Sequence, residues 1–204
     1  MLFEDTYYEI EKPSEGLFKE KGSKFIARAF PVYQEEEIKT ILKQLRKEYY
    51  DARHHCYAYI LNPDKATYRT NDDGEPSGSA GKPIYGQLLS HNLTNILVVV
   101  IRYFGGTKLG IPGLINAYKT ATKEAIANNT IITKTINDIY ALKFDYPLMN
   151  VVMRLIRDEN LQQLKSQFEL SCSLEIAVRK NDSERLLKVF KNIYGLEVTY
   201  LRTV

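Results

Sequence analysis

The longest apolar run of this 204-residue chain, with the arginine that follows it, reads Ile96-Leu97-Val98-Val99-Val100-Ile101-Arg102. Successive side chains of a β-strand point to opposite faces of a sheet. Because every position before the arginine is apolar, both faces are expected to be covered, which places this strand at the centre of its sheet. The run is far too short to cross a bilayer as a helix.

The segments on either side of this strand show the periods of an α+β domain. Residues 34–50 carry the clearest helical pattern, with apolar side chains at three- and four-residue steps, acids in the first turn and basic residues later. The other elements expected in this half are extended structure over 7–31 with a well-covered strand at 25–30, strands over 56–61 and 68–70, and helices over 84–91 and 114–128.

The last third of the chain follows a different order. Strands are expected over 139–146, 168–170, 174–179 and 196–201, and helices over 148–160 and 183–194. The residues expected to face inward from the first helix are Val151, Val152, Leu155 and Ile156. Ser183 is expected to cap the second helix and Gly195 to mark its end. The order βαββαβ is the ferredoxin-like plan, so we predict an α+β protein with domains 1–137 and 138–204.

Composition narrows the classes of function. The 28 basic and 25 acidic residues give a net charge of +3, which lacks the strong basic excess of a general nucleic-acid binder. Cys56 and Cys172 lie in apolar strand-like stretches and are expected to be buried reduced thiols. The N-terminal residues are acidic and form no apolar signal core, so a cytoplasmic location is expected.

Carboxylates and glycines are concentrated before the expected helix at 84–91. The segment, called here the acidic loop, reads Asp72-Asp73-Gly74-Glu75-Pro76-Ser77-Gly78-Ser79-Ala80-Gly81-Lys82-Pro83. Three carboxylates this close are costly to hold together unless a cation, backbone N–H groups or basic side chains face them. Oxygen ligands suit Mg²⁺ or Ca²⁺, but the spacing matches no complete calcium loop, and a solvated turn rich in Asx and Gly is the plainer interpretation.

A second candidate site leaves the end of the apolar strand and enters the next helix. It reads Arg102-Tyr103-Phe104-Gly105-Gly106-Thr107-Lys108-Leu109-Gly110, and residues 104–110 are called here the glycine-rich turn. Backbone N–H groups and the helix dipole favour an anion at such a place, and the two aromatic residues could stack on a base or a partner. The P-loop order Gly-x-x-x-x-Gly-Lys-Ser/Thr is absent, and a simple tight strand-to-helix turn explains the pattern as well.

A third candidate lies at the start of the strand expected at 56–61. The run Arg53-His54-His55-Cys56-Tyr57 places His54 and His55 on opposite faces. No second ligand pair stands at zinc spacing, so a hydrogen-bonded histidine at the end of a strand is preferred to a metal ligand. A serine hydrolase could use Ser77 or Ser79, but the Gly-x-Ser-x-Gly elbow is absent.

Together these segments resemble the YigZ/IMPACT family, whose hallmarks are D-G-E-P-S-G-x-A-G-K-P followed by R-Y-F-G-G-x-x-L-G-x-x-G-L. The matching residues are Asp73–Gly78, Ala80–Pro83, Arg102–Gly106, Leu109, Gly110, Gly113, Leu114, Ala117 and Tyr118, with support from Lys21–Phe25 and the strand His54–Ala58. The resemblance spans nearly the whole chain. It implies an N-terminal domain of the ribosomal protein S5 domain 2-like type and a C-terminal ferredoxin-like domain similar to a module of elongation factor G.

Two departures from the family pattern stand in the second motif. Pro112 replaces a usual glycine, and Asn116 stands where arginine is common. Proline is expected to stiffen the turn just before the helix, because its ring fixes φ. Asparagine removes a positive charge from the proposed anion face, so tight phosphate binding is not expected.

The resemblance implies a link to translation, since eukaryotic relatives restrain an initiation-factor kinase by binding its activator. This chain looks like the two-domain bacterial form. We predict a non-enzymatic, translation-associated regulator that binds RNA, the ribosome or a translation-related protein through residues 72–118, with no cofactor and no membrane partner. The alternative is a small-ligand or nucleotide-binding enzyme, with Mg²⁺ on the acidic loop and phosphate on the glycine-rich turn. No catalytic or metal residue is assigned, and the expected binding residues are Arg53, His54, Arg69, Asp73, Glu75, Ser77, Lys82, Arg102, Tyr103, Phe104, Gly105, Gly106 and Lys108.

Overall fold

The chain forms two compact units in a computed structural model that describes residues 5–168 and 171–204. The larger unit is Tyr7–Lys134, and the smaller unit holds residues 5 and 6 together with the described part of Thr135–Val204. Strands β1 (Thr6–Ile10) and β7 (Ile131–Thr135) pair as a two-stranded sheet, and the unit boundaries fall within them. Strand β7 was not among the expected elements, because no buried face gives it a continuous apolar signal.

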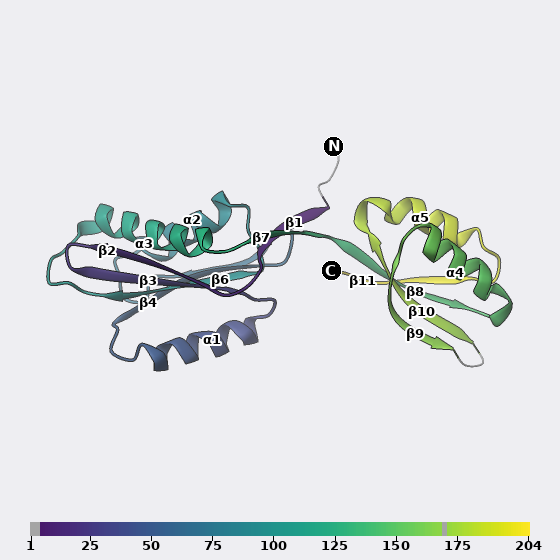
Figure 1. Cartoon of the computed structure of the whole chain (residues 1–204), viewed down its shortest axis with the longest axis horizontal. Helices are drawn as coiled ribbons and strands as arrows, with labels where there is room; N and C mark the ends of the chain where they lie inside the picture. Colours follow the sequence, from purple (N-terminus) through teal and green to yellow (C-terminus); the bar gives the residue numbers. More distant parts are fainter. Residues whose placement is uncertain (1–4, 169–170) are drawn as a thin grey trace. The chain divides into compact units, whose positions relative to one another are not determined.

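The larger unit is built on a five-stranded sheet with the order β2-β3-β6-β4-β5 (Figure 1). Its strands are β2 (Ser14–Glu20), β3 (Ser23–Pro31), β4 (His54–Leu61), β5 (Thr67–Asn71) and β6 (Ile96–Tyr103). All neighbouring strands run antiparallel. The prediction that residues 96–102 form a central strand is confirmed, since β6 lies between β3 and β4.

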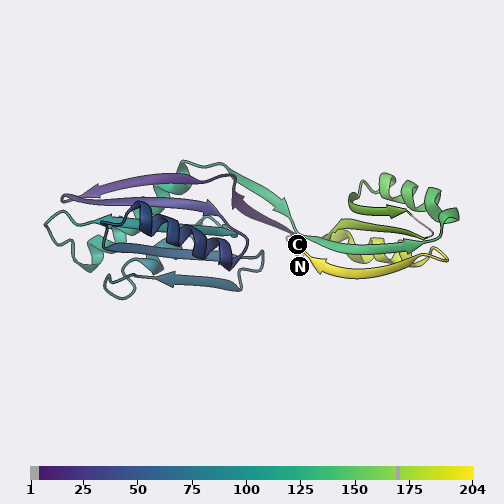
Figure 2. The ribbon, with the colours of Figure 1, turned by 90° about the horizontal axis from the view of Figure 1, so that it is seen from below.

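Helices cover both faces of this sheet. Helices α2 (Gly81–Ser90) and α3 (Gly110–Ala127) pack on one face, and α1 (Glu35–Glu48) lies across the other (Figures 1 and 2). Alternate residues of β6 therefore enter two separate cores, with Val98 under α2 and α3 and Val99 under α1. Complete burial of one such side chain contributes about 1.5–3 kcal/mol, which explains why an unbroken apolar run suits this position.

Helices α2 and α3, which share one face of the sheet, both begin earlier in the sequence than expected. Helix α2 starts at Gly81 because the Asp72 carboxylate accepts hydrogen bonds from the backbone N–H groups of Ala80 and Gly81, at 3.0 and 2.8 Å. Helix α3 starts at Gly110, so Pro112 lies inside its first turn and not before the helix as predicted. Proline is tolerated there because the N–H that it lacks would have no partner within the helix.

The smaller unit contains β8 (Asn137–Phe144), α4 (Met149–Asp158), β9 (Gln162–Phe168), β10 (Cys172–Arg179), α5 (Ser183–Lys191) and β11 (Glu197–Thr203). Short 3₁₀ turns, η1 (Tyr146–Leu148) and η2 (Lys180–Asp182), lead into the two helices. The sheet order is β11-β8-β10-β9, with antiparallel neighbours, and both helices contribute to one core on the sheet. The α+β class and the βαββαβ order are confirmed.

Three local predictions for the smaller unit need correction. Strand β9 ends at Phe168 and does not begin there, because its seven exposed side chains carry no burial signal; residues 169 and 170 of the expected strand lie outside the described part. Val151 is exposed, and Val152 and Ile156 are the buried residues of α4. Ser183 does not cap α5, since its hydroxyl donates to the carboxylate of Asp138 at 2.6 Å.

The remaining general predictions concern thiols and membranes. Both Cys56 and Cys172 are buried and free, as predicted. Within residues 5–168 and 171–204 no helix has the length and apolar character needed to cross a membrane.

Candidate binding site

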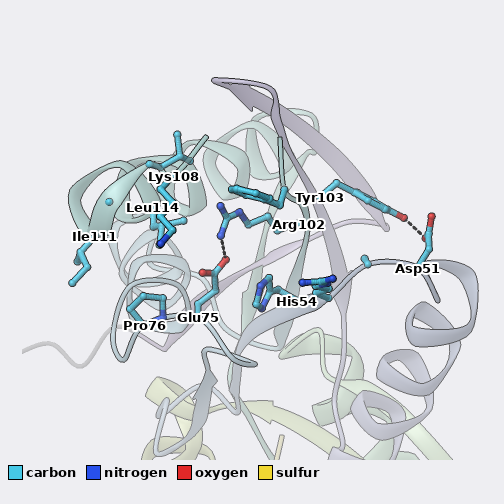
Figure 3. Close-up of a pocket in the computed structure, with 14 residues that line it drawn as sticks. Asp51, His54, Glu75, Pro76, Arg102, Tyr103, Lys108, Ile111 and Leu114 are labelled. Atoms are coloured by element: carbon cyan, nitrogen blue, oxygen red, sulfur yellow. Dashed lines mark hydrogen bonds and ion pairs between the residues drawn. The ribbon is translucent and has the colours of Figure 1, made fainter. Parts of the chain in front are cut away.

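A pocket of about 700 Å³ opens beside the end of β6 in the larger unit (Figure 3). Three segments distant in sequence meet around it: the connection from α1 to β4, the acidic loop, and the glycine-rich turn with the start of α3. The lining residues are Asp51, Ala52, Arg53, His54, Glu75, Pro76, Arg102, Tyr103, Phe104, Lys108, Leu109, Gly110, Ile111 and Leu114.

A buried ion pair forms the inner wall of the pocket. Arg102 Nη1 donates to Glu75 Oε1 at 2.6 Å, and the two side chains are only 8% and 4% exposed. The Arg102 guanidinium also lies over the rings of Phe25 and Phe104, at 5.5 and 5.6 Å from their centroids. Taking both charges out of water is costly, so each depends on the other. The pair ties the acidic loop to the end of the central strand.

Tyr118 of α3 provides a second hydrogen-bond donor to the Glu75 carboxylate of this pair. Its hydroxyl donates to Glu75 Oε1 at 2.8 Å, and the Cys56 thiol lies 3.3 Å from that hydroxyl and 2.9 Å from the Asp72 carbonyl oxygen. Burial raises the pKa of the Cys56 thiol to about 12 and also raises the pKa of Tyr118. Both groups are therefore protonated at neutral pH, so this thiol lacks the thiolate that a nucleophile needs.

Tyr118→Phe is expected to lower the free energy of unfolding of the larger unit by about 1–2 kcal/mol, because a buried carboxylate loses one of its donors. The measurement is hydrogen exchange at the amides of β6 in the full chain. Tyr50→Phe is the matched control, since Tyr50 is 84% exposed. Equal behaviour of the two variants would show that the Tyr118 hydroxyl does not hold Glu75.

The carboxylates of the acidic loop point to different partners within the protein. Asp72 accepts from the N–H groups of Gly78, Ala80 and Gly81, and although burial alone would raise the pKa of Asp72, these donors lower it. Asp73 accepts from Arg46 Nη2 at 2.9 Å and from the His55 N–H at 2.7 Å. No group of three or more His, Cys, Asp or Glu side chains in the described part of the chain is placed to hold a metal ion. The geometry therefore favours a braced loop over a cation site.

His55 follows His54 in β4, does not line the pocket, and contacts the acidic loop through its backbone N–H, which donates to Asp73. His55 is 3% exposed, and neither of its ring nitrogens has a hydrogen-bond partner among the described residues. The ring nitrogen Nδ1 is 4.0 Å from Asp73 Oδ2. Burial lowers the pKa of His55, and the positive charge of Arg46 acts in the same direction. Asp73 and the backbone carbonyl groups of Leu45 and Tyr49 oppose this shift without cancelling it.

Acidification below the ordinary histidine pKa of 6.5 is expected to destabilise the larger unit through His55. The unfolded chain binds the proton first, so stability present above pH 6.5 is lost as the pH falls toward the lowered pKa of the folded state. We expect the difference in unfolding free energy between the wild type and His55→Gln to shrink as the pH falls from neutral through this range. Urea unfolding at several pH values measures it, and parallel curves would contradict the expectation.

The adjacent glycines Gly105 and Gly106 of the glycine-rich turn have different surroundings. A Cβ on Gly105 would lie 1.9 Å from the backbone carbon of Gly22, and the Gly105 N–H donates to the Ser23 hydroxyl at 3.1 Å. Gly105 is therefore packed against the β2–β3 hairpin. Gly106 has φ +87°, and a Cβ added there would meet open space, so of these two glycines only Gly106 has backbone that is open to approach.

Some side chains at the rim of the pocket are hydrogen-bonded within the protein, and others are not. The Tyr103 hydroxyl donates to Asp51 at 2.7 Å, and burial together with this carboxylate raises the pKa of Tyr103 to about 12. His54 Nδ1 is 2.8 Å from the Asp73 carbonyl oxygen, which only accepts, so this nitrogen carries a proton and donates it to that oxygen. Arg53 and Lys108 are exposed, and no hydrogen bond or ion pair to them occurs within the described residues.

The structure brings together seven of the thirteen residues expected to bind: Arg53, His54, Glu75, Arg102, Tyr103, Phe104 and Lys108. The other six do not line the pocket: Arg69, Asp73, Ser77, Lys82, Gly105 and Gly106. Asp73 braces the loop behind His54, Lys82 belongs to α2, and Arg69 stands exposed on the edge strand β5. Asn116 is exposed and does not line the pocket, so it removes no charge from it.

The other seven residues that line the pocket were not among the binding residues expected from the sequence. The missed residues are Asp51, Ala52, Pro76, Leu109, Gly110, Ile111 and Leu114. Four of them, Pro76, Leu109, Gly110 and Leu114, stand in the quoted motifs, so the motifs could have identified them. Asp51, Ala52 and Ile111 carry no local signal of their own.

Comparison with known proteins places these features in a wider group. The sequence profile of the Impact N-terminal domain matches residues 21–126. The chain is 28% identical over 178 residues to the IMPACT family member YvyE of Bacillus subtilis, covering 87% of this chain and 82% of that protein. It is 32% identical over 160 residues to the IMPACT family member YigZ of Escherichia coli, covering 78% of each. A solved structure of a protein described as hypothetical has a TM-score of 0.71 at 28% identity and covers 97% of this chain and 98% of that one.

Proposed function

The chain belongs to the IMPACT family, and from this premise we propose that it is a non-enzymatic, translation-associated regulator that binds its partner through the pocket beside β6. The partner is RNA, the ribosome or a translation-related protein, met in the cytoplasm. The link to translation comes from the family resemblance. In this proposal residues 1–137 form a domain of the ribosomal protein S5 domain 2-like type, and residues 138–204 a ferredoxin-like module similar to one of elongation factor G.

One observation carries the proposal of binding. The buried charges of Glu75 and Arg102 pair with each other at the inner wall, whereas the rim presents the cations Arg53 and Lys108, to which the described residues make no hydrogen bond or ion pair, together with exposed apolar side chains. Phe104 is 57% exposed and Ile111 54% exposed, which is unusual for large apolar residues in a concave site. Pockets that bind partners combine such apolar surface with a few convergent polar groups.

The enzyme alternative has less support from the geometry. Its Mg²⁺ site would need carboxylates that the loop already uses for Arg46, Arg102 and backbone N–H groups. Its phosphate cradle would need Gly105, which packs against Gly22. A thermal-shift screen with nucleotides and Mg²⁺ tests this alternative, because a ligand of the native state raises the midpoint.

The proposal is tested by capture of partners from a lysate with the full chain, with and without RNase. Arg53→Glu and Lys108→Glu reverse the unpaired rim charges and are expected to lose translation-related partners that the wild type retains. Lys123→Glu is the control, since Lys123 is exposed on α3 and does not line the pocket. Retention of the same partners by all variants would refute the proposed use of the pocket, and the RNase arm separates RNA-mediated capture from protein contacts.

A further inference from the structure

We infer that the pocket accepts a peptide segment of a protein partner in which one large apolar side chain lies beside carboxylates. This inference rests on the proposed binding function and names the chemistry of the partner. It commits to a protein rather than to RNA, for reasons of shape, charge and donor placement.

The apolar lining suits an aliphatic or aromatic side chain better than a stack of bases. Ile111, Leu109 and Leu114 come from the start of α3, and Ala52 and Pro76 from the other two segments of the pocket. Folds that read single-stranded RNA stack successive bases on several aromatic side chains. Here the lining holds two such rings, Tyr103 and Phe104, and one face of Phe104 already lies over Arg102.

The charges around the pocket favour carboxylates. Its two acids are both occupied, Glu75 by Arg102 and Asp51 by Tyr103, whereas the cations Arg53 and Lys108 have no partner among the described residues. An acidic segment would therefore meet complementary charge without displacing an existing bond. Two exposed cations are too few for the continuous basic track that a phosphate backbone needs, and the net charge of +3 adds no such excess.

Unused donors point in the same direction. Helix α3 has 18 residues, its first turn contains no acid, and none of the side chains in the described part of the chain caps its first N–H groups. Gly110 and Ile111 of that turn line the pocket, so the positive end of the helix dipole is close to a bound ligand. Arg102 lines the same pocket with a side chain that is more than nine-tenths buried, and its Nε has no partner in the described part of the chain. A carboxylate is an acceptor that suits this set of donors.

The test is selection of peptides from a random display library on the full-length protein, with counter-selection on Lys108→Glu. The expected result is enrichment of peptides that place Asp or Glu next to Phe, Leu, Ile or Met. Enrichment of peptides without acids, or no enrichment that depends on Lys108, would overturn the inference. The proposed function is tested independently by the lysate capture. It would still stand if Arg53→Glu and Lys108→Glu lose their partners there, and it would be refuted if they keep them.

Fluorescence anisotropy with the most enriched peptide quantifies the contact. Lys108→Glu and Ile111→Ser are each expected to weaken binding at least about tenfold, a loss of about 1.4 kcal/mol. Lys123→Glu and Leu89→Ser are the matched exposed controls and should bind like the wild type. Rising salt should weaken binding by the wild type, because the charges at the rim are exposed. Tighter, Lys108-dependent binding of oligo(U) than of the peptide would overturn the choice of a protein partner.

Discussion

Glu75→Ala is expected to lower the free energy of unfolding of the larger unit by about 3–5 kcal/mol, the usual cost of removing one partner of a buried ion pair. The variant leaves the Arg102 guanidinium buried against Phe25 and Phe104 with no opposite charge. It also removes the acceptor of the Tyr118 hydroxyl. The loss of stability therefore comes from unpaired groups that remain, more than from the bond that disappears.

Hydrogen exchange at the amides of β6 and β4 in the full chain measures this effect. Glu36→Ala is the control, since Glu36 pairs with Lys39 on the exposed face of α1, and such a pair contributes less than about 1 kcal/mol. Glu75→Leu combined with Arg102→Met removes both charges at once and is expected to recover most of the loss. A loss for Glu75→Ala no larger than that of the control would mean that water reaches the pair in solution.

Gly105→Ala is expected to cost about 3 kcal/mol or more, because the added methyl group meets backbone and not a mobile side chain. The nearest atoms are the carbon of Gly22 at 1.9 Å and the nitrogen of Ser23 at 2.2 Å. The hairpin between β2 and β3 must move away, and the glycine-rich turn with it. We therefore expect the variant to lose partner binding together with stability.

Two other glycines provide controls for Gly105→Ala. At Gly106 the only penalty is the positive φ of +87°, which costs a residue with a side chain about 1–2 kcal/mol. At Gly86, inside α2, an added Cβ meets nothing within 4 Å, and alanine is expected to stabilise the helix by about 0.5–1 kcal/mol. Chemical denaturation ranks the three variants. A cost at Gly105 equal to that at Gly106 would show that the hairpin yields easily.

The motif residues divide into those that shape the pocket and those that are available to a ligand. Glu75, Gly105 and Tyr118 are occupied by contacts within the protein, and Arg102 pairs with Glu75 through Nη1 while its Nε has no partner among the described residues. Lys108 and Ile111 are available at the rim, and both stand at positions that the motif R-Y-F-G-G-x-x-L-G-x-x-G-L leaves open. The motif therefore describes mainly how the pocket is built, and we expect selectivity among partners to reside in residues outside its fixed letters.

The sequence by itself determined the secondary structure wherever one face of an element is buried. The central strand was evident because Ile96–Ile101 is apolar on both faces, and the βαββαβ order followed from periodic apolar positions in the last third. The prediction failed for strands that have no buried face, because their sequences show no periodic apolar pattern. Strand β9 is exposed throughout and β7 has no buried residue, so neither carries a continuous apolar face.

Only the tertiary structure decided which groups of the candidate site meet. Glu75 and Arg102 are 27 residues apart and Glu75 and Tyr118 are 43 apart, so local propensity contains nothing about either pair. The same holds for Gly105, whose role depends on a hairpin more than eighty residues earlier in the chain. Three carboxylates close together in sequence looked like one site, but the turn of the backbone directs them to three different sets of donors. Hydrophobic periodicity is a short-range property of the chain, whereas a binding site is made by long-range contacts that exist only after the sheet has closed.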